Sequence, residues 1–396
     1  MRKRVYFLKL GLPAASGGVL AMAIGACLAP TVAGDDPALK RKQGGVRPES
    51  IRAAVERVLP LLVKASSVEY PLHRECFSCH NQAVPALALS LARQRGFVVD
   101  AQTLRAIAEH TEADLSSAID DYRKGQGQPG GVIRAGYALW ALEATGWKAD
   151  ETTAAVAHYL AVAAGKRDHL PVSSRRPPSE SSDFTATALA LRGVLAFGPS
   201  GLAATANDRA QKKSLDQPVR AAEVLWREPV LRWLTRTKPR DTEDRVFRLW
   251  GLKSAGASAD ELARAVADLL KVQRLDGGWS QLDASPESPK GDAEKGGGAA
   301  RATPATALQS DAYATGSVLV ALALAGGLDS ENPIYRRGLE FLLRTQRDDG
   351  SWFVKSRSRP FQTYFESGFP HGPDQFISAA ASAWAVAALT LALPIP

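Results

Sequence analysis

The chain is poor in sulfur-containing residues. Of its 396 residues, three are cysteine (Cys27, Cys76 and Cys79) and two are methionine (Met1 and Met22). Three cysteines are too few for the disulfide framework that stabilises many small secreted domains. A packed core must therefore stabilise the fold, and a chain that is 45% hydrophobic and 23% charged has enough material for one or two domains.

Long apolar runs are missing after residue 33, where no stretch has the roughly 18 consecutive apolar residues of a membrane-spanning helix. Residues 1–33 join a basic start, MRKR, to a small apolar segment, which is typical of a secretory signal peptide. Cleavage could follow TVA before Gly34, or the lipobox-like IGAC (24–27) could leave a lipid-modified Cys27. We expect an exported protein of the bacterial periplasm or cell envelope, attached to a membrane only through a lipid at Cys27.

A large excess of positive charge is also lacking. The net charge of +8 falls to +4 without the leader, which carries four basic residues and no acid. Basic and aromatic residues form no interleaved stripe, so nucleic acid is not an expected partner.

Alternating strand patterns are scarce, and apolar residues recur at helical spacing along most of the chain. Six apolar segments share one frame and start at residues 81, 131, 183, 241, 311 and 378. Each follows an amphipathic helix, expected near 50–66, 101–118, 150–164, 219–236, 259–272 and 333–345. The repeat predicts an all-α fold, a six-hairpin (α/α)6 toroid with inner and outer helix rings, over residues 49–396 after a linker at 34–48.

Two outer helices end in nearly identical turns, QRLDGGW (273–279) and QRDDGSW (346–352). These turns resemble the QW motif of the terpenoid cyclase and protein prenyltransferase family, which includes the squalene-hopene cyclases. The resemblance implies a toroid around a central cavity for a hydrophobic small molecule. It also implies that each Gln and Trp ties one hairpin to the next.

The sequence contains no match to the reactive groups of that family. Its class II cyclases use the central aspartate of a D-x-D-D run, and DLSSAIDD (114–121) does not match that run. Its prenyltransferases bind zinc through residues that include a late cysteine, and no cysteine follows Cys79. Asp183 and Asp311, at the starts of inner segments, are interpreted as helix caps. No catalytic residue is therefore predicted.

The segment ECFSCHNQ (75–82) contains the run C-x-x-C-H, formed by Cys76, Cys79 and His80. This run is the attachment signature of haem c, in which two thiols form thioethers and the histidine binds the iron. A disulfide or thiol redox pair, a zinc corner and a chance occurrence remain alternatives. We predict haem c, with His80 as its metal ligand.

Closure of the ring would bring the last hairpin beside the first, so His371 in the segment YFESGFPHGPDQF is the candidate second iron ligand. No methionine follows Met22 to take that position. The chain also resembles exported proteins that combine a prenyltransferase and squalene-oxidase type repeat with an N-terminal C-x-x-C-H. The first functional hypothesis is a haem-bearing toroid with a redox or ligand-binding role and a redox partner. The alternatives are an isoprenoid-binding or cyclase-like transferase or isomerase with a structural cysteine pair, and a non-catalytic scaffold.

Overall fold

The computed structural model describes residues 46–198, 218–282, 309–360 and 362–396, and gives only the backbone at 218–225. All of them lie in one compact unit, residues 44–396. The expected leader with Cys27, most of the linker and most of the loops expected at 198–218 and 281–309 lie outside the described residues. Within the described ranges the regular structure is helical, apart from a single β-bridge between Arg176 and Glu180.

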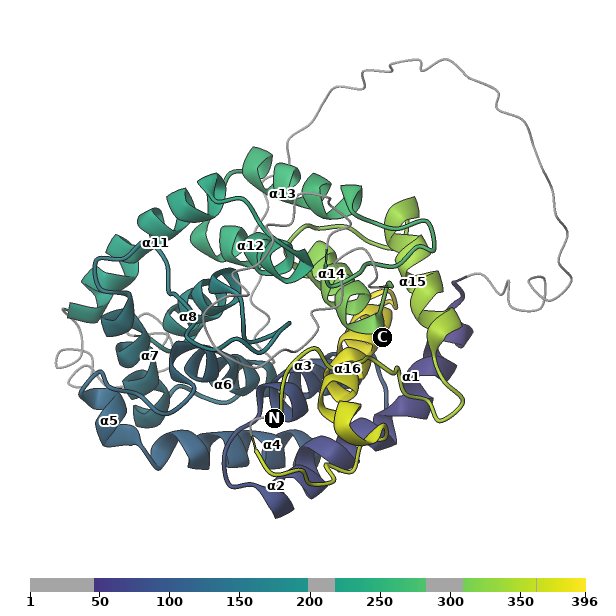
Figure 1. Ribbon diagram of the computed structural model, residues 1–396, viewed down its shortest axis with the longest axis horizontal. Coiled ribbons are helices and arrows are strands. Elements are labelled where there is room, and N and C mark those ends of the chain that lie inside the picture. The colour runs from purple at the N-terminus through teal and green to yellow at the C-terminus, as the bar shows by residue number, and fades with distance from the viewer. Residues whose placement is uncertain (1–45, 199–217, 283–308, 361) are drawn as a thin grey trace, which may run out of the picture. The chain divides into compact units, whose positions relative to one another are not determined.

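The helices form two concentric rings, as Figure 1 shows. The outer ring contains α1 (Pro48–Val63), α4 (Ala101–Ser116), α7 (Glu151–Ala164), α11 (Pro218–Arg236), α13 (Ala259–Lys271) and α15 (Pro333–Thr345). The inner ring contains α3 (Val84–Gln94), α6 (Gly131–Thr145), α8 (Asp183–Phe197), α12 (Thr242–Ala255), α14 (Ala312–Leu324) and α16 (Gln375–Leu391). Short helices α2 (Tyr70–His73) and α5 (Ile119–Arg123) and π-helical turns at Lys64–Glu69 and Cys79–Ala83 complete the first two hairpins. The predicted six-hairpin (α/α)6 toroid is confirmed.

Inner and outer helices differ in composition because they meet different surroundings. Every residue of α14 from Ala312 to Leu322 is buried, whereas α13 buries only Ala265, Val266 and Leu269. A helix that is apolar on all sides belongs in a core, and one with a narrow apolar stripe belongs at the surface. Among the described residues, no helix is both long enough and apolar enough to cross a membrane.

Side chains cap the starts of two outer helices. Ser258 and Glu261 form a capping box at α13, and the Asn332 side chain accepts backbone N–H groups at the start of α15. Such caps satisfy amide groups that have no partner within the helix.

The two QW turns use the same set of contacts to join successive hairpins. Gln273 donates to the carbonyls of Gly277 and, on α15, Ile334, at 2.8 and 2.7 Å. Gln346 donates to the carbonyls of Gly350 and, on α1, Ala54, at 2.8 and 2.7 Å. Because the last contact joins residues 292 positions apart, it links the sixth hairpin to the first.

The tryptophans of these turns are buried beneath them. The indoles of Trp279 and Trp352 donate to the carbonyls of Leu269 and Leu342, at 2.8 and 2.9 Å. Helix α16 packs between α14 on one side and α1 and α3 on the other. The ring is therefore closed by its last inner helix as well as by its last QW turn.

Candidate functional site at the start of the inner helices

The inner helices begin at one mouth of the ring, and polar side chains cap α8, α12 and α14 there. Asp241 accepts the Asp244 amide at the start of α12, and Asp311 accepts the Ala314 amide at the start of α14, each at 2.9 Å. The expected cap of α8, Asp183, is wrong, because Ser182 accepts the amide of the first turn. Asp183 instead accepts the backbone N–H of Val172, at 2.8 Å, and so holds the preceding loop.

Glu243 lies one position inside the first turn of α12 and is the most unusual group at this mouth. Its side chain is 3% exposed. The hydroxyls of Thr185 and Tyr313 both donate to its Oε1, at 3.3 and 3.4 Å. Burial, followed by the nearby charges of Asp241 and Asp244, raises its pKa from 4.5 to about 8. Glu243 is therefore a protonated acid near neutral pH, and Oε2 is the oxygen left to carry the proton.

Two further carboxyl groups at the mouth have raised pKa values. Burial is the main cause for both Asp241 and Asp311, each with a pKa of about 6. Arg357 counteracts these shifts from the loop before α16. It donates to Gln281 at 3.2 Å, and Gln281 donates to Asp311 Oδ2 at 3.0 Å. The mouth thus holds carboxyl groups with different pKa values beside two guanidinium groups, that of Arg357 and that of Arg240, which pairs with Asp244 at 3.0 Å.

The four residues Asp241, Thr242, Glu243 and Asp244 fill the frame of a D-x-D-D run, with glutamate in its third position. The run does not match D-x-D-D when aspartate is required in the third position, so Glu243 was not predicted as a catalytic residue. Glutamate carries the same carboxylic acid on a side chain longer by one methylene group. A search that accepts either acid in the third position, at the start of an inner helix, would have found it.

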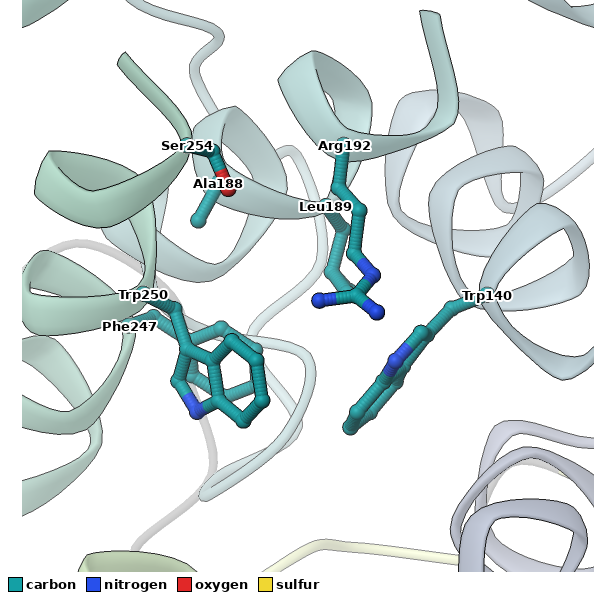
Figure 2. Close-up of a pocket in the computed structure, with 7 residues that line it drawn as sticks. All are labelled: Trp140, Ala188, Leu189, Arg192, Phe247, Trp250 and Ser254. Carbon is teal, nitrogen blue, oxygen red and sulfur yellow. The ribbon is translucent and has the colours of Figure 1, made fainter. Parts of the chain in front are cut away.

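An aromatic pocket lies along the same helices, one to three turns further from the mouth. Thr185, Tyr137 and Glu243 are followed three or four residues later by Leu189, Trp140 and Phe247, which therefore share their helix faces. The complete lining is Trp140, Ala188, Leu189, Arg192, Phe247, Trp250 and Ser254, and it encloses about 220 Å³ of empty space, part of it open to solvent. Figure 2 shows Arg192 reaching toward the gap between the indoles of Trp140 and Trp250.

The C-x-x-C-H segment precedes the first inner helix. Cys76 is partly buried, Cys79 is buried, and neither forms a disulfide. The Tyr70 hydroxyl lies 3.7 Å from the Cys76 sulfur. Burial raises the pKa of the Cys79 thiol, which disfavours the reactive thiolate.

The side chain of His80 meets the loop that leads into α8. Its Nε2 lies 2.9 Å from the Ser179 hydroxyl, and its Nδ1 lies 3.8 Å from Glu180 Oε1. Burial lowers the pKa of His80, although Glu180 opposes that shift. Tyr137 donates to the carbonyl of Ser179 at 3.4 Å. This tyrosine lies one turn before Trp140 of the aromatic pocket, so the His80 contacts and the pocket share helix α6.

His371 contacts the second QW turn and a neighbouring phenylalanine. Its Nε2 lies 2.7 Å from the Ser351 hydroxyl in the second QW turn, and its ring packs edge-on against Phe353. The loop that contains it does reach the first hairpin, where Phe365 packs against Tyr70. No contact of His371 with Cys76, Cys79 or His80 is found, and its role as an iron ligand stays a prediction.

The described part of the chain contains no evident site at which side chains alone would bind a metal ion. No group of three or more His, Cys, Asp or Glu side chains there could hold one. His110 is half-buried, and its ring nitrogens contact Gln82 and the carbonyl of Arg74. The zinc-corner alternative therefore gains no support from the residues around Cys76 and Cys79.

Comparison with known proteins gives one family match and several distant structures. Residues 245–372 match the family described as the squalene-hopene cyclase C-terminal domain. A variant of the type II terpene cyclase MstE from Scytonema, solved with its substrate geranylgeranyl dihydroxybenzoate, is 16% identical, with 88% of this chain and 99% of that chain covered and a TM-score of 0.49. A protein from Actinoplanes is 15% identical, with coverages of 87% and 100% and a TM-score of 0.46.

A possible member of the GH105 family from Klebsiella pneumoniae is 13% identical, with coverages of 92% and 99% and a TM-score of 0.43. No curated protein matches the chain. The family match begins two residues after Glu243 and includes both QW turns. Residues 245–372 therefore carry the pattern of the squalene-hopene cyclase C-terminal domain, and the resemblance found in the two turns is confirmed over this part of the chain.

Proposed function

We propose that the protein is an acid catalyst that protonates a carbon–carbon double bond of an apolar, isoprenoid-like substrate. The observation that carries this proposal is the buried Glu243, with its pKa of about 8. A general acid is most effective when its pKa lies near the working pH, because it is then protonated and still able to release the proton. The activity printed for the Scytonema enzyme, type II terpene cyclisation, is of the same kind.

The proposed reaction has three steps, which begin with the proton of Glu243. The proton on Oε2 adds to one alkene carbon and leaves a cation on the other, while Glu243 becomes a carboxylate. Attack by a second double bond closes a ring, and loss of a proton to water or to the carboxylate ends the reaction. No electrons are gained or lost overall, so the product is an isomer of the substrate.

The aromatic pocket supports the same chemistry. The faces of Trp140, Phe247 and Trp250 are electron-rich, and such faces stabilise a nearby cation by about 0.5–2 kcal/mol each. Part of the space between these side chains is open to solvent, and the reacting end of an isoprenoid chain would meet them there.

The test is turnover of squalene and of geranylgeranylated compounds in buffered D₂O, followed by mass spectrometry of extracted products. We expect cyclised products with one deuterium, and activity that falls above about pH 8, where Glu243 loses its proton. Glu243→Gln should abolish turnover, whereas the control Glu56→Gln, at an exposed position on α1, should retain it. Equal turnover by wild type and Glu243→Gln would refute the assignment.

A redox or ligand-binding role at the same mouth is the second candidate function. The unpaired thiols of Cys76 and Cys79 directly before His80 favour it, because these are the groups that attach haem c. Export to the periplasm or cell envelope, the lipid anchor at Cys27 and a redox partner belong to this proposal and rest on the sequence. A haem-staining gel of the exported protein tests it.

A further inference from the structure

We propose that the aromatic pocket binds an isoprenoid with a hydroxyl head group, with the chain directed toward Glu243 and the hydroxyl held by Arg192 and Glu143. The inference rests on the proposed function for the isoprenoid chain, and it adds the head group and the direction in which the substrate lies. It distinguishes a hydroxylated substrate from a diphosphate and from a pure hydrocarbon.

The inner helices around the pocket carry a buried acid at one end and a half-exposed ion pair at the other. Glu243, in the first turn of α12, is 3% exposed. Arg192 and Glu143 lie toward the last turns of α8 and α6, and their side chains are 31% and 33% exposed. A polar head group keeps part of its hydration at this end, whereas burial beside the acid would require new hydrogen-bond partners. The apolar chain therefore points inward, past the aromatic side chains of the lining.

Arg192 is held in position by two neighbours. Its Nε and Nη2 donate to the two carboxylate oxygens of Glu143, at 2.5 and 3.1 Å. Its guanidinium carbon lies 5.3 Å from the centre of the Trp250 ring, within the range at which a cation and an aromatic face attract each other. Figure 2 shows the guanidinium reaching toward the gap between Trp140 and Trp250. The described residues provide no acceptor for Nη1, so its N–H groups are available to an oxygen atom of a ligand.

The carboxylate of Glu143 determines which head groups fit. It compensates the charge of Arg192, so the pair has no net charge with which to attract an anion. A diphosphate placed beside Nη1 would lie close to this carboxylate and be repelled by it. A hydroxyl group can accept a hydrogen bond from Arg192 and donate one to Glu143, because it is both donor and acceptor. The hydroxyl of Ser254, also in the lining, is a further polar group at this end.

The length of α12 gives the shortest chain that would reach both the acid and the ion pair. Glu243 and Ser254 are eleven residues apart on this helix, which is a rise of about 16 Å and the extended length of about three isoprene units. A chain of fewer units would leave one of the two ends without contact. Farnesol, which has three units and a hydroxyl group, is therefore the simplest probe.

The experiment measures binding to the full chain by calorimetry, with wild-type protein and with Glu243→Gln, in which turnover cannot consume the ligand. The probes are farnesol, farnesyl diphosphate and the hydrocarbon farnesene, each in the same nonionic detergent. We expect both proteins to bind farnesol about tenfold more tightly than farnesyl diphosphate at pH 7, because the diphosphate meets the carboxylate of Glu143. Arg192→Met should weaken farnesol binding about tenfold, because a hydrogen bond from a charged group is lost, and leave farnesene binding unchanged.

Glu143→Gln tests the choice of head group directly, because it keeps the shape of the pair and removes the carboxylate charge. The uncompensated guanidinium should strengthen farnesyl diphosphate binding about tenfold and remove the preference for farnesol. Glu228→Gln, which removes the carboxylate of an exposed pair with Arg232 on α11, is the matched control and should keep the wild-type ratio. An unchanged ratio in Glu143→Gln protein would overturn the proposal. So would tighter binding of farnesyl diphosphate than of farnesol by the wild type, a result that needs no variant.

The head-group site and the acid can fail separately. Farnesol binding with these preferences, but without turnover of any isoprenoid by the wild type, would support the head-group site and refute acid catalysis. Turnover of squalene by a protein that shows no preference for farnesol over farnesyl diphosphate would support the acid and overturn the head-group site.

Discussion

The free energy of unfolding should fall less with rising pH when Glu243 is replaced by glutamine. Glutamine keeps the shape of the protonated acid and retains Oε1 as the acceptor for Thr185 and Tyr313. The folded protein holds the Glu243 proton up to a pKa of about 8, whereas the unfolded chain releases it near 4.5. As pH rises between these values, only the unfolded state loses the proton, and the free energy of unfolding therefore falls.

The size of the effect follows from the two pKa values. Each pH unit between them changes the free energy of unfolding by about 1.4 kcal/mol. The contribution of Glu243 therefore falls by roughly 3 kcal/mol from pH 4.5 to pH 7, and by roughly 5 kcal/mol once pH exceeds 8. Glutamine does not titrate, so the variant should gain this amount over the wild type as pH rises.

The assay is thermal and urea unfolding of both proteins from pH 4.5 to 8.5. At about 2 °C per kcal/mol for a domain of this size, the melting temperatures should diverge by ~6 °C between pH 4.5 and pH 7. Glu56→Gln, at an exposed site, is the control and should follow the wild type. A constant difference between Glu243→Gln and wild type across this range would show that Glu243 is ionised in the folded protein, and the proposed acid would be lost.

Two further predictions concern ring closure. Gly350 has φ of +87°, and a Cβ there would lie 2.7 Å from the carbonyl oxygen of Arg57, so Gly350→Ala should cost about 3 kcal/mol or more. Gly146→Ala, at φ of +78° with open space around it, should cost only about 1 kcal/mol, and equal losses in urea unfolding would contradict the steric argument. Gln346→Ala removes the two hydrogen bonds that its Nε2 donates, including that to Ala54, and the one that its Oε1 accepts from Arg57, and should cost about 1–3 kcal/mol. Its effect should appear as faster hydrogen exchange in α1 and α15, and unchanged exchange there would contradict a closing role.

The fold was predictable from the sequence because the signal repeats. Six pairs of helices share one frame, and the two QW turns indicate the same repeating hairpin. An error in predicting one hairpin therefore does not change the predicted number of hairpins. Caps such as Ser258 and Asn332 were also predictable, because a cap depends only on residues within one turn. The prediction that Asp183 caps α8 was wrong because Ser182 and Asp183 are adjacent and both are good cap residues.

The acid site was harder to predict because its properties depend on residues far apart in the sequence. Glu243 owes its pKa to burial and to Asp241 and Asp244, and its partners Thr185 and Tyr313 come from two other inner helices. An amphipathic pattern does not reveal that a glutamate in a first turn points into the ring. The contacts of His80 with Ser179 and Glu180 likewise join the first hairpin to a loop about 100 residues later.

The bond from Gln346 to Ala54 has a consequence for biosynthesis. After Ala54 the ribosome must add a further 292 residues before its partner Gln346 exists, and α16 follows later still. Until then the flanks of α1 and α3 that receive α16 have no cover, and their apolar side chains are available to other chains. Non-local pairing of this kind slows folding. The nascent protein should therefore depend on chaperones until its last helix has docked, and a truncation before residue 375 should yield aggregates rather than a smaller folded ring.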